Sequence, residues 1–328
     1  MHGQMWDAHV MTRLGYQVPN FTYPGVGSDG LFEAVAAQAV EAEESGFDTV
    51  LVMDHFYQLH MLGAPDNAMI ECYTLLAALS QRTSRVRLSA LVTGNTYRHP
   101  SLLAKTVTAL DVVSGGRAQL GIGAGWFELE HDSLGFEFGT FTERFEKLEE
   151  ALRIVIPMLR GERPSLEGTW YSVHEAINSP APVGRIPVMI GGGGEKKTLR
   201  MVAQYADESN IICAPDEIPR KLAALDEHCE RLGRDRSQIT VTYQTSAVIA
   251  PTKEQAQAEL DAAVAAIPEL AARAGGVILG SPDEVRPIYE RILASGVDGV
   301  TVNLPANGHV PGRVALLGET LAPVVNRS

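Results

Sequence analysis

The sequence predicts a single α/β domain with the (β/α)8, or TIM-barrel, fold, and three observations lead to this fold class. Short runs rich in β-branched residues alternate with amphipathic helical runs, which is the pattern of parallel strands joined by helices. Eight such repeats follow one another without a change of composition. The 328 residues are enough for one large barrel. An open doubly wound sheet would share much of this pattern.

The elements are expected in a regular order along the chain. Strands are expected at 14–18, 49–53, 86–92, 118–122, 187–190, 209–212, 239–248 and 299–303. Helices are expected between and after them at 30–45, 69–82, 100–114, 140–159, 195–206, 217–232, 253–272, 282–295 and 313–325. Two helix starts have physical support. Pro100 occupies a favoured first-turn position, and residues 281–284 (SPDE) supply a cap, a proline and two acids.

Two segments fall outside these repeats. Residues 1–10 precede the first strand and are interpreted as an N-terminal extension without a role, so that residues 11–328 form the single domain. Residues 161–186 are rich in proline and have no clear period. They are interpreted as a long insertion between the fourth helix and the fifth strand, with a role in substrate gating.

Charge and composition exclude several classes of protein. The net charge of −13 argues against nucleic acid or an anionic membrane as a partner. No apolar run approaches the roughly 20 residues that cross a bilayer, and the first ten residues lack the pattern of a signal peptide. Cys72, Cys213 and Cys229 are far apart, which argues against disulfides or structural zinc. We therefore expect a cytoplasmic protein that acts on a small molecule.

Other chemistries that barrels support lack their motifs here. The first predicted strand has no HxH pair, and three-ligand metal spacing is absent elsewhere in the sequence. The GxSxG motif of serine hydrolases is also missing. We therefore expect no metal site and no serine nucleophile.

Asp54 and His55 follow the second predicted strand directly. In a parallel barrel, the chemistry lies where strands end and loops begin. A histidine at such a place, held by a neighbouring carboxylate, can take or give a proton near neutral pH. The alternative is an aspartate that caps the loop and a histidine at its surface. His55 is the candidate catalytic residue.

The third and fourth predicted strands end in small residues. Thr93-Gly94-Asn95 indicates an irregular strand end or a bulge, where the backbone can approach a flat ligand closely. Gly121, Gly123 and Gly125 are spaced GxGxG rather than GxGxxG, which argues against a Rossmann nucleotide site. These glycines favour a ring that lies against the barrel mouth, with Trp126 as a wall. A tight turn with a packed tryptophan is the alternative.

Four glycines follow the fifth predicted strand, namely Gly191, Gly192, Gly193 and Gly194. Such a run costs much backbone entropy, so we infer that bare amides are needed there. Free N–H groups at a helix N-terminus form an anion site, and Lys196, Lys197 and Arg200 add positive charge. The run is interpreted as a phosphate-binding loop, with a flexible turn as the alternative.

At these residues the sequence resembles the superfamily of luciferase-like monooxygenases and deazaflavin-dependent oxidoreductases, most nearly its actinobacterial branch that uses coenzyme F420. The motifs that carry the resemblance are MDHF at 53–56, ECYTLLAALSQRTSRVRL at 71–88, LVTGNTYRHPSLLAKTVTALDVVSGGRAQLGIGAGW at 91–126, IPVMIGGGGEKKTLRMVAQYAD ending at 207, and LGSPDEV at 279–285. In this order they are specific for the family and uninformative about the substrate.

The resemblance implies a cofactor ring at the C-terminal mouth of the barrel, with its phosphate on the strand-five loop. It also implies a non-proline cis peptide within 91–94. The cofactor-binding residues expected on this basis are Asp54, Val92, Thr93, Gly94, Gly125, Trp126, Lys196 and the four glycines 191–194.

The resemblance also suggests roles for the residues that close strand two. In the deazaflavin-dependent sugar-phosphate dehydrogenases of this superfamily, an aspartate at this place contacts the cofactor and a histidine acts as base, which correspond here to Asp54 and His55. Those enzymes have an acidic residue soon after the strand-four glycines. This chain has Trp126 there, with Glu128 and Glu130 further on. The departure leaves the substrate and the proton-transfer partner open.

Three functions follow from this resemblance. The first is an F420-dependent oxidoreductase that moves a hydride between the deazaflavin and a small organic substrate. The second is an FMN-dependent luciferase-like monooxygenase, and the third is a non-catalytic flavin-binding barrel. The polyglutamate tail of F420 would be repelled by a −13 surface, so a local basic strip is expected. For assembly we expect a homo-oligomer, namely a dimer.

Overall fold

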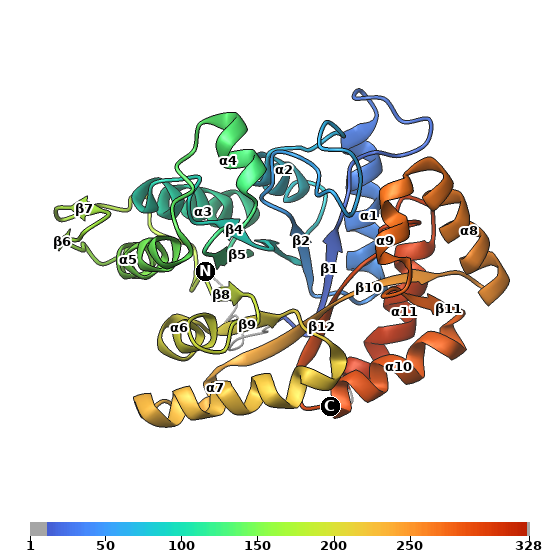
Figure 1. Cartoon of the computed structure of the whole chain (residues 1–328). Coiled ribbons are helices and arrows are strands. Elements are labelled where there is room, and N and C mark those ends of the chain that lie inside the picture. The colour runs from blue at the N-terminus through green and yellow to red at the C-terminus, as the bar shows by residue number, and fades with distance from the viewer. Residues whose placement is uncertain (1–11, 327–328) are drawn as a thin grey trace, which may run out of the picture.

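A computed structural model describes residues 12–326, in which eight parallel strands close into a barrel (Figure 1). Around the ring these strands are β1 (Leu14–Val18), β2 (Thr49–Val52), β3 (Arg87–Ala90), β5 (Ala118–Gly123), β8 (Val188–Gly191), β9 (Glu208–Ile211), β10 (Thr240–Ile249) and β12 (Gly299–Asn303). The pairings of β9 with β10 and of β12 with β1 close the ring. The barrel is therefore confirmed over an open sheet. The predicted extension, residues 1–10, lies outside the described residues.

Helices cover the outside of this ring. They include α1 (Leu31–Ser45), α2 (Cys72–Leu79), α3 (Pro100–Ser114), α5 (Phe141–Leu159), α6 (Thr198–Tyr205), α7 (Ile218–Leu232), α8 (Lys253–Ala266), α10 (Pro282–Ala294) and α11 (Arg313–Val325). The starts of α5 and α10 carry capping boxes, in which Thr140 and Ser281 pair with Glu143 and Glu284. No helix of the described chain has the length and apolarity of a membrane span.

Some elements differ from the sequence-based expectation for local reasons. The third strand, expected at 86–92, ends at Ala90, and a separate short strand, β4 (Thr93–Gly94), follows. The peptide between Leu91 and Val92 is cis, as the family resemblance implied. Pro268 ends the regular part of the helix expected at 253–272, and a 3-10 turn (Pro268–Leu270) and α9 (Ala271–Ala274) follow. The short strand β11 (Ile278–Gly280) pairs with the end of β10.

Helix α4 (Glu128–Leu134) was not expected from the sequence. Its buried side chains are Glu130 and His131, which are polar, so an apolar periodicity is missing. Tertiary contacts, rather than a hydrophobic stripe, hold this helix over the barrel mouth (Figure 1).

The segment between α5 and β8 contains a small antiparallel pair, β6 (Leu166–Glu167) and β7 (Ser172–Val173). The Glu150 carboxylate of α5 accepts backbone N–H groups of residues 169–171 and fixes the turn. The Tyr171 ring packs edge-on against His99, at the N-terminal end of α3, with centroids 5.4 Å apart. The segment is thus held against α5 and the N-terminal end of α3. Gating by this insertion remains a prediction.

Candidate active site

The mouth of the barrel, where the strands end, brings together the residues after β2, β4, β5 and β8. His55 lies three residues beyond the end of β2, and Glu130 lies in α4, after β5. The Nδ1 atom of His55 lies 2.9 Å from Oε2 of Glu130. Glu130 is completely buried, so this carboxylate acts on its hydrogen-bond partners without competition from water.

Glu130 is held from several directions. Its Oε1 atom accepts the backbone N–H groups of Phe56 and Tyr57, and its Oε2 atom also accepts the Tyr97 hydroxyl. Burial opposes the charge of Glu130, but the hydrogen bonds from His55, Tyr97 and Tyr57 lower its pKa below the ordinary value. A charged Glu130 fixes a proton on His55 Nδ1. The Nε2 atom of His55 has no partner among the described residues and is the ring nitrogen open to a substrate.

A second histidine of α4 has a structural role. His131 is buried, and its Nδ1 atom lies 2.8 Å from the carbonyl oxygen of Phe127. Its Nε2 atom lies 2.6 Å from the Thr96 hydroxyl. Both ring nitrogens are therefore used, and they tie α4 to the loop that follows β4.

Asp54 is turned away from His55. Arg98 donates two hydrogen bonds, of 2.6 and 2.9 Å, to the Asp54 carboxylate and a third of 2.6 Å to Glu71. The backbone N–H of Gly94 also donates to Asp54, at 3.1 Å. Burial raises the pKa of Asp54, while Arg98 opposes that change. The carboxylate that holds His55 is thus Glu130 and not the adjacent Asp54. A contact between Asp54 and a cofactor remains a prediction.

The bulge after β3 places Val92 between two neighbouring strands. A Cβ on Gly191 would lie 2.8 Å from Val92 Cγ1, and a Cβ on Gly123 would lie 2.9 Å from Val92 Cγ2. Glycine at both positions is therefore required by the Val92 side chain. Thr93 is buried and its hydroxyl pairs with Tyr73 at 2.6 Å, so it points away from the mouth. Val92 is itself only partly buried, so its apolar side chain lies between the ends of β5 and β8.

Trp126 and Gly125 border the mouth as expected. Gly125 has a φ of 79°, in the left-handed region that favours glycine, and turns the chain after β5. The Trp126 side chain is half exposed, with its ring centroid 5.7 Å from that of His55. Contact with a cofactor remains a prediction.

The glycine loop after β8 is open and partly exposed. Gly192 has a φ of 119°, and a Cβ on Gly193 would lie 2.8 Å from the Ile212 carbonyl oxygen. Helix α6 begins at Thr198, later than expected, so most of the loop is not helical. Lys196 is exposed, whereas Lys197 lies over the Phe141 and Phe145 rings.

Only some of the charge expected around this loop is available to a ligand. Arg200 is committed to Glu149 at 2.7 Å, so it does not supply the positive charge that the sequence suggested. Glu195 pairs with Lys221 at 2.8 Å and with Arg220 at 2.6 Å. The lysines at 196 and 197 remain as candidates for a phosphate contact.

Three amide side chains inside the barrel, Gln17, Gln244 and Asn303, form a hydrogen-bonded group that we call the amide floor. They were not identified from the sequence. Gln17 of β1 accepts hydrogen bonds at its Oε1 atom from Gln244 of β10, at 2.8 Å, and from Asn303 of β12, at 2.7 Å. The Thr301 hydroxyl donates a further hydrogen bond to Oε1 of Gln244. Gln17 lies beside Asn303 in the sheet register, and alternation along the strands points both side chains inward.

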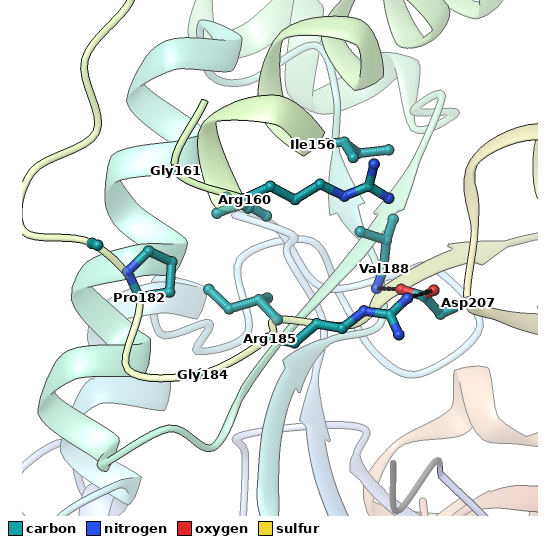
Figure 2. Close-up of a pocket in the computed structure, with 11 residues that line it drawn as sticks. Ile156, Arg160, Gly161, Pro182, Gly184, Arg185, Val188 and Asp207 are labelled. Atoms are coloured by element: carbon teal, nitrogen blue, oxygen red, sulfur yellow. Dashed lines mark hydrogen bonds and ion pairs between the residues drawn. The ribbon is translucent and has the colours of Figure 1, made fainter. Parts of the chain in front are cut away.

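A separate cavity of about 310 Å³ lies at the other end of the barrel (Figure 2). It is lined by the end of α5 and by Val188, the first residue of β8, with Arg160 and Arg185 at its edge. Arg185 is paired with Asp207. Since His55 and the glycine loop lie at the carboxyl ends of the strands, this cavity is not part of the candidate site. Within residues 12–326, no group of three metal-ligating side chains comes together.

Comparison with known proteins gives a consistent assignment. The model of the family described as luciferase-like monooxygenase matches residues 12–307. An F420-dependent glucose-6-phosphate dehydrogenase from Microbacterium testaceum is 33% identical over 66% of this chain and 64% of its own length. One of the same description from Rhodococcus hoagii is 29% identical over 87% of this chain and 91% of its own length. The alignment to the first of these relatives thus spans less than two thirds of that protein.

Solved structures of low sequence identity share the fold. An F420-dependent tetrahydromethanopterin reductase from Methanopyrus kandleri superposes with a TM-score of 0.75 at 20% identity, covering 95% of this chain and 99% of the other. An F420-dependent secondary alcohol dehydrogenase, solved with an F420–acetone adduct, gives 0.79 at 20% identity, covering 96% and 99%. A monooxygenase from Streptomyces bottropensis gives 0.80 at 20% identity, covering 95% and 99%.

Proposed function

The chain belongs to the luciferase-like monooxygenase family, and on that premise we propose that it is a coenzyme F420-dependent oxidoreductase that exchanges a hydride with a small organic substrate. The observation that carries the proposal is the His55–Glu130 pair, 2.9 Å apart, at a mouth where the partly buried Val92 lies between the ends of β5 and β8. Relatives along most of the chain are named F420-dependent dehydrogenases, which supports the same cofactor.

The residues of the mouth fit such a cofactor. Glycine at 191 and 193 lets the loop pack closely against Val92 and the Ile212 carbonyl, and Gly194 is exposed beside Lys196. We assign the Val92 surface to the ring, and the glycine loop with Lys196 to the phosphate. When bound, the deazaflavin supplies a carbon that gives or accepts a hydride and does not activate oxygen.

His55 moves the proton that accompanies the hydride. In the oxidative direction, the substrate hydroxyl gives its proton to Nε2 of His55, because Nδ1 already donates to Glu130. The Glu130 carboxylate stabilises the imidazolium that results. In the reductive direction the same imidazolium returns the proton to the substrate oxygen. Trp126 and Phe127, whose ring centroids lie 5.7 and 5.6 Å from that of His55, limit the access of water.

Fluorescence titration of the purified protein with F420 and with FMN tests the cofactor. We expect saturable binding of F420 that is tighter than that of FMN, followed by F420 turnover with an alcohol or carbonyl panel. Tighter binding of FMN would favour the monooxygenase instead. Cofactor binding without turnover of any substrate would favour the non-catalytic barrel. We place the enzyme in the cytoplasm as a homodimer, and sedimentation analysis tests the assembly.

A further inference from the structure

The loops at the carboxyl ends of the strands carry few cations. The connections after β1, β2, β5, β9, β10 and β12, before the helices that follow them, contain no lysine or arginine. Arg98, after β4, is committed to Asp54 and Glu71. Lys196 and Lys197 belong to the glycine loop assigned to the cofactor. Among the described residues, Arg98, Lys196 and Lys197 therefore leave no unpaired cation near His55 that could bind an anionic substrate.

The wall beside His55 is apolar. Met53, Leu59, Phe127 and Leu270 form a buried cluster there, which joins the loop after β2 to α4 and to the 3-10 turn before α9. A charged group buried against such a wall without a partner is costly. The wall therefore suits the hydrocarbon part of a substrate and disfavours a phosphate.

The amide floor is the polar group that could bind an uncharged substrate. Gln17 Oε1 accepts from both Gln244 and Asn303, so its own NH2 group is the part left without a partner among the described residues. Gln17 is 6% exposed, so the floor is not sealed. The Oδ1 atom of Asn303 is buried without a partner, as are several other polar atoms of the described residues. A polar ligand or water beside Gln17 and Asn303 would satisfy both amides.

We propose that the substrate is a small uncharged alcohol or carbonyl compound whose oxygen accepts a hydrogen bond from the Gln17 side-chain amide. This inference rests on the proposed function. In oxidation, the C–H bond breaks with its electron pair going to the deazaflavin, and the hydroxyl proton goes to His55. The alcohol becomes a carbonyl compound, and its oxygen stays on the Gln17 NH2 group throughout. Gln17 is thus a positioning and specificity-determining residue.

The substrate class is tested with F420 and a panel of small secondary alcohols beside glucose 6-phosphate. The neutral alcohols should give the higher kcat/KM. If wild-type protein does not bind F420, the proposed function fails before this inference is reached. If F420 binds and glucose 6-phosphate is the better substrate, the uncharged class is wrong.

The role of Gln17 is tested with two variants that change different hydrogen-bonding groups of the side chain. Gln17→Met removes both functions of the amide, whereas Gln17→Glu keeps an acceptor for Gln244 and Asn303 and replaces the NH2 donor by a carboxyl oxygen. Both should lower kcat/KM for the alcohol by roughly 10-fold, mainly through KM, with the Kd for F420 unchanged. Gln204→Met, an exposed site on α6, is the matched control. Wild-type KM and kcat in Gln17→Met, which cannot donate a hydrogen bond, would overturn the assignment of Gln17.

Discussion

His55 and Glu130 stand 75 positions apart in the chain, and their side chains meet at 2.9 Å across the barrel mouth. The loop after β2 supplies the histidine, and α4 supplies the carboxylate. Glu130 also accepts backbone N–H groups from the residues that follow His55, so it fixes both the loop and the imidazole ring. Under the proposed mechanism, Glu130 is therefore a positioning residue for proton transfer by His55.

Replacement of Glu130 by glutamine should lower turnover by about 10- to 10²-fold, which is part of what general acid–base catalysis provides. The glutamine NH2 group would donate where His55 Nδ1 needs an acceptor. The imidazole would then have to adopt the tautomer whose proton is on Nε2, which cannot accept the substrate proton. The pH–rate profile should change along with the rate, and F420 affinity should not. Glu128→Gln, at an exposed position on the same helix, is the control. An unchanged profile in Glu130→Gln would show that Glu130 only supports the loop.

His55→Ala should bind F420 nearly as wild type does, yet lose turnover by about 10²- to 10⁴-fold. The physical reason is that Nε2 of His55 has no partner among the described residues and lies on a ring that contacts Trp126 at the mouth. His60→Ala, an exposed histidine of the same loop, is the control. Single-turnover rates measured against pH decide the matter. A variant with wild-type chemistry and the same profile would remove His55 from the mechanism.

Alanine at Gly192 or Gly193 should weaken F420 binding while leaving the far-ultraviolet circular dichroism unchanged. Gly192 has a φ of 119°, and a Cβ on Gly193 would meet the Ile212 carbonyl, so either change moves the loop. Gly233→Ala is a matched control, because its φ is 65° and no atom lies within 4 Å of the added Cβ. Equal F420 affinity in all three variants would place the phosphate elsewhere.

Glu208→Gln should stabilise the protein at neutral pH. Glu208 is fully buried within the barrel, and its Oε2 atom has no hydrogen-bond partner among the described residues. Burial raises the pKa of Glu208, with hydrogen bonds from Thr12 opposing the change only in part. The folded state therefore favours the protonated acid. The free energy of unfolding should fall as pH rises from the unfolded pKa, about 4.3, through the raised folded value.

The glutamine variant lacks this penalty, since it cannot ionise and its NH2 group can donate where the carboxylate cannot. Its thermal midpoint should exceed that of wild type at pH 8, by an amount equivalent to roughly 1–3 kcal/mol, and the advantage should shrink towards pH 4. Thermal unfolding across that range measures both. Glu290→Gln, at an exposed site on α10, is the control. A constant difference between wild type and Glu208→Gln at all pH values would contradict the titration.

The sequence alone determined the barrel, because each βα repeat carries its own signal. Strand and helix periodicity depend on neighbouring residues, so expected and observed elements agree closely, and α3 and α11 begin and end where the sequence placed them. His55, the bulge near Val92 and the glycine loop were also identified from the sequence. In a parallel barrel, strand ends must meet at one mouth, whatever the loops do.

Tertiary structure decided which of these groups act on one another. The sequence suggested Asp54 as the partner of His55, but Arg98 binds Asp54 from a different loop and Glu130 takes its place. The Gln17–Gln244–Asn303 floor joins three strands that lie far apart in the chain. Such contacts depend on how the ring closes and on how α4 packs over it. The periodicity of the sequence predicts neither ring closure nor the packing of α4. It indicates which way a side chain points, but not which side chain from another element it contacts.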